Sequence, residues 1–321
     1  MKPPLDRTTA PAPAGAPRLR RPLDASARGV DARMVLWMLF LSGLWGLNAI
    51  TIKAVATDMA PLAAVGLRGA VALTCLSLWG WWRGERLWFG GRLGLHSLVA
   101  GLLFTAEFIL FYTGARMTTG GHVAIYINTA PFFVAAGAHF LLPGERMTPW
   151  RWLGLGLAFG GILALFGDDL FVHRGGYWRG DLLVIAGALI WGATTVYIKR
   201  FMVQDMSGFE LLYVQILVST PLLLAVVGAT QPEALLLVTP RAGAIVVFQG
   251  TVIVFFSYLA WSTLLRVYPA NAMQSFTFLT PVWGVAIGAL ALGEPVRGGT
   301  LLGIALVGVG LYFVNRPRRA R

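Results

Sequence analysis

The sequence is poor in the residues that usually build metal and redox sites. Its 321 residues include one cysteine, Cys75, and only four histidines. A single cysteine excludes an internal disulfide and a cysteine-based metal site. The histidines, at positions 96, 122, 139 and 173, do not have the spacing of metal ligands. We therefore expect neither a metal nor another cofactor.

Charged residues are also scarce, at 12% of the sequence, whereas hydrophobic residues make up 57% and the mean hydropathy is +0.69. A chain of this length cannot bury so much apolar surface in a water-soluble fold. The apolar stretches are continuous rather than alternating, which excludes a membrane β-barrel. The sequence has no Walker motif, and its polar connections are too short for a separate domain. These features predict a polytopic α-helical membrane protein.

Ten apolar stretches have the length of membrane-crossing helices, about 18 to 23 residues. They lie near residues 35–55, 62–82, 94–114, 121–142, 149–167, 180–201, 208–229, 242–264, 270–291 and 298–315. Residues 1–33, rich in Pro, Ala and Arg, are expected to form a disordered basic tail near anionic lipid headgroups. A short basic tail, 316–321, follows the last stretch.

The chain contains an internal repeat. A Trp-Gly pair with a lysine seven residues after the glycine occurs at 45–53 and again at 191–199, 146 residues later. A proline followed by a Gly-Glu turn occurs at 131–145 and again at 281–294, displaced by 150 residues for the proline and 149 for the turn. Several motifs that recur at nearly one offset indicate a tandem duplication.

The two predicted repeats, 34–167 and 180–315, each contain five membrane spans. Because five is odd, the second repeat enters the membrane from the opposite face, so the repeats are inverted about an axis in the membrane plane. Inverted repeats suit alternating access, since exchange of their conformations gives two states of similar energy. The predicted fold is therefore an all-α integral membrane protein with ten transmembrane helices as two inverted five-helix repeats.

The basic residues lie mainly on one side of the predicted membrane. Of 26 Lys and Arg residues, 19 fall in the two tails and the connections on that side, 6 fall on the other side, and Arg68 lies within a span. This asymmetry places both tails in the cytoplasm. The net charge of +12 could suggest nucleic-acid binding, but the basic residues do not lie on a folded domain that could bind nucleic acid. We therefore do not expect nucleic acid as a partner. We expect the lipid bilayer and a small-molecule substrate as partners; the oligomeric state is open.

Taken together, these motifs resemble the EamA-type members of the drug/metabolite transporter superfamily. The resemblance covers residues 34–315 and rests on the repeated Trp-Gly with its lysine, the arginine in span two, the prolines in spans four and nine, and the Gly-Glu turns. It implies a ten-helix carrier of the bacterial inner membrane, usually an exporter of amino acids, metabolites or toxic amphiphiles. It implies no particular substrate.

Polar and aromatic residues within the spans are the candidates for a substrate site. Arg68 and Glu107 are expected at one depth, either as a structural ion pair or as groups that contact the substrate or exchange a proton. For any other single candidate, the alternative is a hydrogen bond between packed helices. The full set is Trp45, Asn48, Arg68, Glu107, His122, Tyr126, Asn128, Trp191, Gln249, Tyr258, Gln274 and Thr277.

Other features have structural interpretations. Lys53 and Lys199 are expected to extend to the membrane interface, with substrate contact as the alternative. Glu145 is expected to cap the helix that follows it. Glycine pairs at 156 and 160, and at 299 and 303, predict close helix packing, either within one protomer or between protomers. The prolines at 131, 221 and 281 predict kinks or hinges.

The expected function is secondary transport. The sequence has no paired carboxylates, His-Asp cluster or nucleophile with its base, so we do not expect an enzyme. Aromatic groups, neutral hydrogen-bonding groups and few charges suit export of small amphipathic or zwitterionic metabolites such as amino acids. Carriers of sugars, nucleotide sugars or toxic cationic compounds are alternatives, and an enzyme or scaffold acting on lipid is the alternative of another class. Direction and energy coupling stay open.

Overall fold

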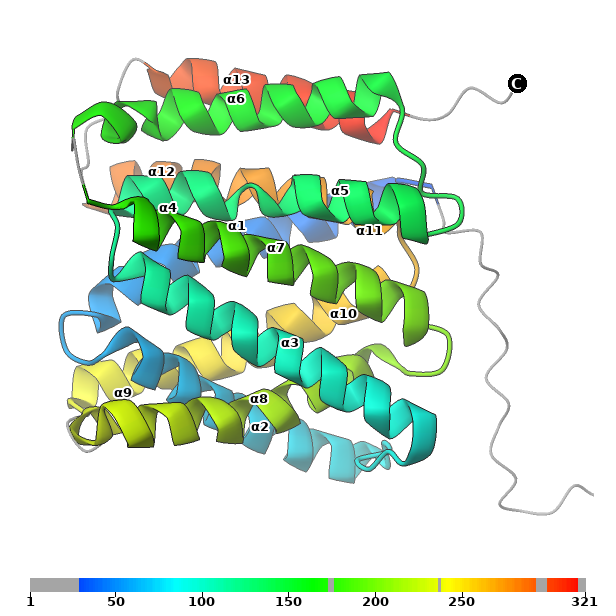
Figure 1. The fold of residues 1–321 in the computed structure, drawn as a ribbon, viewed down its shortest axis with the longest axis vertical. Helices are drawn as coiled ribbons and strands as arrows, with labels where there is room; N and C mark the ends of the chain where they lie inside the picture. Colours follow the sequence, from blue (N-terminus) through cyan, green and yellow to red (C-terminus); the bar gives the residue numbers. More distant parts are fainter. Residues whose placement is uncertain (1–28, 173–175, 236–237, 293–298, 317–321) are drawn as a thin grey trace, which may run out of the picture.

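The computed structural model describes residues 29–172, 176–235, 238–292 and 299–316. Within these ranges the chain is helical and has no β-strand, and the long helices run roughly along one direction (Figure 1). Nine helical segments are long and apolar enough to cross a membrane, and a further apolar helix has 17 residues. The all-α membrane fold is therefore confirmed.

The helices match the predicted spans to within a few residues. The first half contains α1 Ala32–Val55, α2 Pro61–Arg83, α3 Gly91–Ala115, α4 Gly120–Ile127, α5 Ala130–Leu141 and α6 Pro149–Val172. The second half contains α7 Trp178–Phe201, α8 Gly208–Thr230, the 3-10 turn η1 Pro232–Leu235, α9 Pro240–Phe248, the π-helix η2 Gln249–Ser257, α10 Tyr258–Leu265, α11 Ala270–Ser275, the 3-10 turn η3 Phe276–Phe278, α12 Leu279–Leu292 and α13 Gly299–Asn315. Spans four and nine are each divided into shorter helices.

The sequence specifies several helix ends directly. At the start of α1, the Asp31 carboxylate accepts a hydrogen bond from Met34 N at 2.8 Å. Ser207 and Glu210 form a capping box at the start of α8. Helix α2 begins with proline, whose missing N–H costs nothing in a first turn, and ends at Gly84 in the left-handed conformation.

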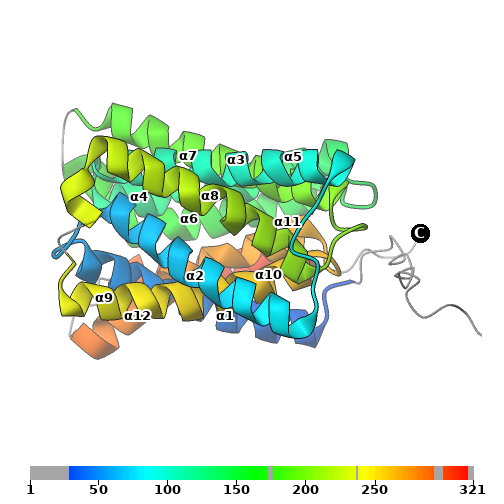
Figure 2. The same ribbon diagram turned by 90° about the horizontal axis from the view of Figure 1, so that it is seen from below.

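Corresponding helices of the two halves run in opposite directions. In Figure 1, α3 and α6 run from right to left, whereas α9–α10 and α13 run from left to right. Figure 2 shows α3, α5 and α7 on one side of the bundle and α1, α9 and α12 on the other. Each side thus combines helices of both halves, as inverted copies would.

The glycine of each Trp-Gly motif lies at a close crossing between the halves. A Cβ on Gly46 of α1 would lie 2.6 Å from the Cβ of Trp283 on α12. A Cβ on Gly192 of α7 would lie 2.8 Å from the Cβ of Phe133 on α5. Phe133 and Trp283 are 150 residues apart. The repeated motif therefore lets the first helix of each half pack against the broken span of the other half.

Helices α6 and α13 pack through four glycines. A Cβ on Gly154 would lie 2.7 Å from the oxygen of Gly310, and a Cβ on Gly161 would lie 2.6 Å from the oxygen of Gly303. Both contacts are shorter than a side-chain carbon can tolerate. The two helices consequently approach to backbone contact at two levels.

The two predicted glycine pairs differ in their surroundings within the protomer. Gly299 and Gly303 do meet the α6 backbone, because a Cβ on Gly299 would lie 2.5 Å from the oxygen of Ala164. Gly156 and Gly160, in contrast, have open space where a Cβ would lie. The spacing of small residues could not distinguish the face toward α13 from the face turned away from it.

These glycines give a test of helix packing. Gly161→Ala should lower the thermal stability of the purified protein, because overpacking a close contact costs about 1–3 kcal/mol. Gly160→Ala, one residue away and facing open space, should leave the melting temperature nearly unchanged. Fluorescence-detected size-exclusion after heating measures both variants. Equal melting temperatures for the two variants would contradict the packing described for α6 and α13.

The predicted orientation can be tested at exposed positions between helices. Gly90 lies between α2 and α3 and has open space for a side chain, and Glu233 lies exposed between α8 and α9. In a Cys75→Ala background, Gly90→Cys should react with an impermeant thiol reagent only after the cells are opened. Glu233→Cys should react in intact cells. Labelling of Gly90→Cys in intact cells would reverse the orientation.

Candidate functional site

Both halves interrupt the fourth of their five spans at equivalent positions. Helix α4 ends at Ile127 and α5 begins at Ala130, just before Pro131. In the second half, the α11 helix gives way to a 3-10 turn at Phe276–Phe278, just before Pro281. Proline lacks a backbone N–H and clashes with the preceding turn, which accounts for the interruptions. Pro221, by contrast, lies inside the continuous helix α8.

The two interruptions lie near each other in the bundle. The α4 segment has 8 residues, so its end is about 12 Å inside the span at 1.5 Å per residue. The turn in span nine begins after a similar length from the opposite end. Phe132 in α5 contacts Phe278 in the turn edge to face, with ring centroids 6.5 Å apart. Discontinuous spans of this kind often form substrate sites in transporters.

Most polar side chains at the interruptions bind their own helix. Asn128 Nδ2 donates to the oxygen of Ala124 at 2.7 Å, and Thr277 Oγ1 donates to the oxygen of Gln274 at 2.7 Å. Such local bonds satisfy carbonyl groups near an irregular turn. The structural alternative thus accounts for the observed hydrogen bonds of Asn128 and Thr277.

Gln274 is the exception among these residues. Its side chain is fully buried, and neither the amide nitrogen nor the amide oxygen has a hydrogen-bond partner. Leaving a buried polar group unpaired costs about 1–3 kcal/mol. A buried amide with both donor and acceptor free therefore has unused capacity to bind a polar solute or water.

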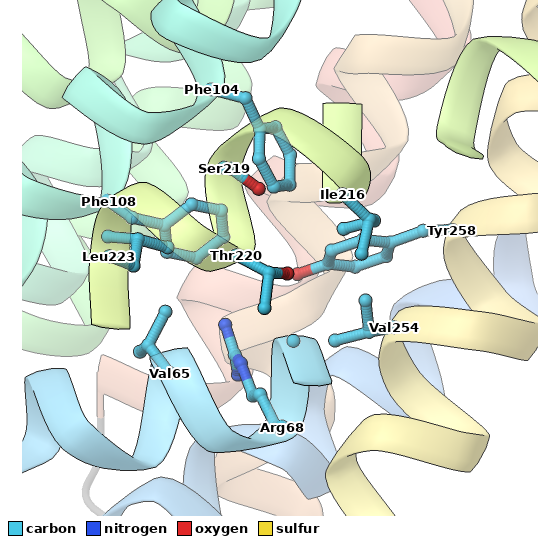
Figure 3. Close-up of a pocket in the computed structure, with 11 residues that line it drawn as sticks. Val65, Arg68, Phe104, Phe108, Ile216, Ser219, Thr220, Leu223, Val254 and Tyr258 are labelled. Atoms are coloured by element: carbon cyan, nitrogen blue, oxygen red, sulfur yellow. The ribbon is translucent and has the colours of Figure 1, made fainter. Parts of the chain in front are cut away.

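A second unpaired group, Arg68 of α2, lies between α3, α8 and the helices of span eight (Figure 3). Arg68 is only 3% exposed, and its Nη1 atom has no hydrogen-bond partner. The guanidinium carbon lies 5.3 Å from the ring centroid of Phe108 and 6.0 Å from that of Tyr112. These aromatic faces stabilise the cation but leave its hydrogen-bonding capacity unused.

The predicted structural ion pair between Arg68 and Glu107 is not formed. Among the described residues no ion pair joins them, and Glu107 Oε2 is itself buried without a hydrogen-bond partner. Equal depth in the membrane placed both groups at one level, but it could not specify the face of α3 from which Glu107 projects. The result is two buried ionisable groups that are not paired with each other.

The cavity beside Arg68 is small. Its volume is about 10 Å³, which admits one water molecule at most. Figure 3 shows Arg68 pointing toward Thr220, whose hydroxyl is also buried without a partner, with Tyr258 on the adjoining wall. Binding of a larger solute here requires separation of the surrounding helices.

The span-eight helix is wound as a π-helix beside this cavity. The two ends of the π-helix are bonded to α1, where Gln249 Nε2 donates to Thr51 Oγ1 and Trp45 Nε1 donates to Ser257 Oγ, each at 3.0 Å. A Cβ on Gly250 would lie 2.8 Å from the oxygen of Arg68. π-Helical turns occur frequently at functional sites. No pattern in the sequence indicated one here.

The remaining candidates lie around α1 and α7. Asn48, which is 8% exposed, accepts a hydrogen bond from Thr51 at 3.3 Å. Trp45 packs edge to face on Trp261, with ring centroids 5.5 Å apart. Trp191 is partly buried on α7.

His122 belongs to a contact at one end of the bundle rather than to a central cavity. The carboxylate of Asp181, at the start of α7, accepts from Thr118 Oγ1 at 2.5 Å and contacts His122 Nδ1 at 2.9 Å. The ring of His122 also contacts that of Tyr126, with centroids 5.7 Å apart. This contact ties the first helix of the second half to the connection before α4.

A corresponding contact lies at the opposite end. Asp31, at the start of α1, accepts from the hydroxyl of Tyr268, before α11, at 3.0 Å. Thr118 and Tyr268 are 150 residues apart, whereas Asp31 precedes α1 and Asp181 lies in the first turn of α7. We call these two contacts the end latches. The sequence analysis missed them because each joins residues of different halves.

Lys199 and Glu145 depart from their predicted roles. Lys199 Nζ does not extend to the interface but donates to the oxygens of Leu265 and Tyr268, at 2.5 and 2.8 Å. Glu145 caps α11 of the other half rather than α6, accepting from Asn271 N at 3.1 Å. Burial raises the pKa of the Glu145 carboxyl, although hydrogen bonds from the α11 backbone oppose the shift. Lys53, in contrast, is exposed.

The family model for EamA-like transporters matches residues 32–167 and 178–316. The chain belongs to the EamA-like transporter family. The two EamA matches fall on the two predicted repeats. The resemblance found in the sequence is therefore confirmed.

Similar proteins include transporters of several bacteria. The "Probable amino-acid metabolite efflux pump" of Escherichia coli (strain K12) is 25% identical over 282 residues, covering 84% of this EamA chain and 90% of that protein. The "Uncharacterized transporter YoaV" of Bacillus subtilis (strain 168) is 24% identical over 288 residues, which cover 88% of this chain and 96% of that protein. A protein of known crystal structure aligns with a TM-score of 0.75 at 17% sequence identity, and the alignment covers 89% of this chain and 98% of that one. This shows that the two proteins share a fold.

Proposed function

We propose that this EamA-like transporter is a secondary carrier of the inner (plasma) membrane that exports small amphipathic or zwitterionic metabolites, such as amino acids. The observation that carries the proposal is the buried, unpaired amide of Gln274 beside two interrupted spans. Interrupted spans at a repeat interface are the usual setting of a carrier's substrate site. Both termini lie in the cytoplasm in this proposal, as the basic residues predict.

The chemistry of the buried groups supports the proposed substrate class. Gln274 offers one neutral donor and acceptor pair, and Arg68 offers one cationic donor. A phosphorylated solute would call for several basic groups, whereas one arginine and one carboxyl group, Glu107, suit a zwitterionic solute. The name of the E. coli relative supports amino-acid metabolites as the first solutes to test.

The end latches support alternating access. Each latch bonds the two halves to each other, and the latches lie at opposite ends of the bundle. Both contacts are formed in this structure. Opening toward one side of the membrane requires that one latch separate while the other stays closed.

The test of the site is Gln274→Met, which keeps the size of the side chain and removes its hydrogen-bonding groups. Thermal stability should rise, because an unpaired buried amide costs about 1–3 kcal/mol. Export activity should fall, because the substrate loses its partner. Both are measured on the same preparation, as melting temperature and as transport in proteoliposomes of a solute first identified by growth resistance in overexpressing cells.

Gln215→Met is the matched control. Gln215 is also buried, but its amide nitrogen donates to the oxygen of Leu211 at 2.7 Å. This variant loses an existing hydrogen bond, so its stability should not rise and its transport should persist. Wild-type transport by Gln274→Met, or an equal loss in both variants, would refute the proposed site.

A further inference from the structure

A second cavity lies where α3 begins and α7 ends. Its volume is about 480 Å³, and its walls include Arg92 and His96 of α3, Arg200 and Phe201 of α7, and Asp205. This is the end of the bundle at which α7 gives way to α8, on the right in Figure 1. In the predicted orientation this end faces the cytoplasm.

Neutral groups hold the two arginines in place. Arg92 Nε donates to His96 Nε2 at 3.3 Å, and His96 Nδ1 contacts the hydroxyl of Tyr197 at 2.6 Å. The ring of His96 stacks on that of Phe201, with ring centroids 5.5 Å apart. The guanidinium carbon of Arg200 lies 5.9 Å from the centroid of the Phe201 ring. Imidazole and aromatic groups orient the guanidinium groups without neutralising them.

No carboxylate of the described residues forms an ion pair with Arg92 or Arg200. Asp205 contributes one negative charge to the cavity wall, against two arginines. The cavity therefore keeps an excess positive charge and has room for an anion, whose binding two guanidinium groups would favour.

The other half of the chain shows how such an arginine is neutralised internally. Arg241, 149 residues after Arg92, lies 3.8 Å from a carboxylate oxygen of Asp58, which also accepts from Thr239 at 3.3 Å. The residue 146 positions after Asp58 is Gln204, which also lines the cavity. The next residue, Asp205, lies 147 positions after Asp58 and also lines the cavity, but no ion pair among the described residues joins it to Arg92.

An apolar strip continues from this cavity along α3. Leu95, Leu98 and Leu102 are 61%, 46% and 46% exposed and lie near one face of the helix. In a membrane-spanning helix such side chains contact acyl chains. A positive cavity at the membrane surface, followed by an exposed apolar strip, matches the two parts of a phospholipid.

We infer that the cavity between α3 and α7 binds the phosphate headgroup of an anionic phospholipid. Arg92 and Arg200 supply the charge, and the leucines of α3 lie beside the acyl chains. Basic pockets between helices at the cytoplasmic surface have the chemistry that anionic headgroups require. Because α3 and α7 belong to different halves, the lipid bridges the two halves.

Lipid binding is tested by native mass spectrometry of the purified, delipidated protein titrated with phosphatidylglycerol. The Arg92→Gln/Arg200→Gln variant should bind the first lipid more weakly, by about fivefold for each arginine removed. Arg241→Gln, which removes an equivalent arginine that already has a partner, is the matched control and should bind as the wild type does. Equal affinity in all three proteins, or an equal loss in Arg241→Gln, would overturn the inference.

A second variant keeps both arginines. Gln204→Asp adds a second carboxylate to the cavity wall, so it should weaken binding of phosphatidylglycerol without removing a basic group. The Arg92→Lys/Arg200→Lys variant should retain most of the affinity for phosphatidylglycerol, because the positive charge is kept. Unchanged binding in Gln204→Asp would contradict the electrostatic basis of the site.

The source of the phosphate is distinguished in the same preparation. Phosphatidylglycerol should raise the melting temperature of the wild type, whereas inorganic phosphate at the same concentration should not, because it lacks acyl chains to contact α3. Equal stabilisation by inorganic phosphate would assign the cavity to a soluble anion and refute the lipid. None of these measurements depends on transport, so the result is independent of the proposed substrate.

Discussion

Two close helix crossings, at Gly46 and Gly192, position the rest of the structure. At each crossing the first helix of one half meets the broken span of the other half with almost no side chain between the backbones. A larger residue at either position would push α1 from α12 or α7 from α5. The interruptions in spans four and nine would then separate, and with them the buried groups around Gln274. The repeated Trp-Gly motif thus fixes the geometry between the halves.

The two halves share their helix-packing features but not their unpaired polar side chains. The crossings, interruptions and end latches occur in both halves. The unpaired groups occur once, since Gln274 is matched 150 residues earlier by Ala124, and span seven has no arginine to match Arg68. A symmetric frame with two states of similar energy suits transport in general. Asymmetric polar groups inside that frame can select one class of solute.

Sequence reasoning predicted what depends on local pattern and failed where partners come from the other half. The length of the apolar stretches predicted the membrane spans, and the repeated motifs predicted the division into two halves. Depth along a helix did not fix its rotation, so of the two alternatives for Arg68 and Glu107 the ion pair is not formed. Lys199 and Glu145 looked like local helix-end groups, yet each bonds backbone from the α10–α11 region. The π-helix of span eight had no local signal at all.

The central claim is that the two ends of the bundle open alternately, each by release of its own latch. Spin labels at Arg33 and Gln204 report one end, and labels at Arg179 and Thr57 report the other; electron–electron resonance measures both distances. Tyr268→Phe should lengthen the Arg33–Gln204 distance alone, and Thr118→Val should lengthen the Arg179–Thr57 distance alone. If either variant lengthened both distances together, or neither variant changed its own distance, the account would be contradicted.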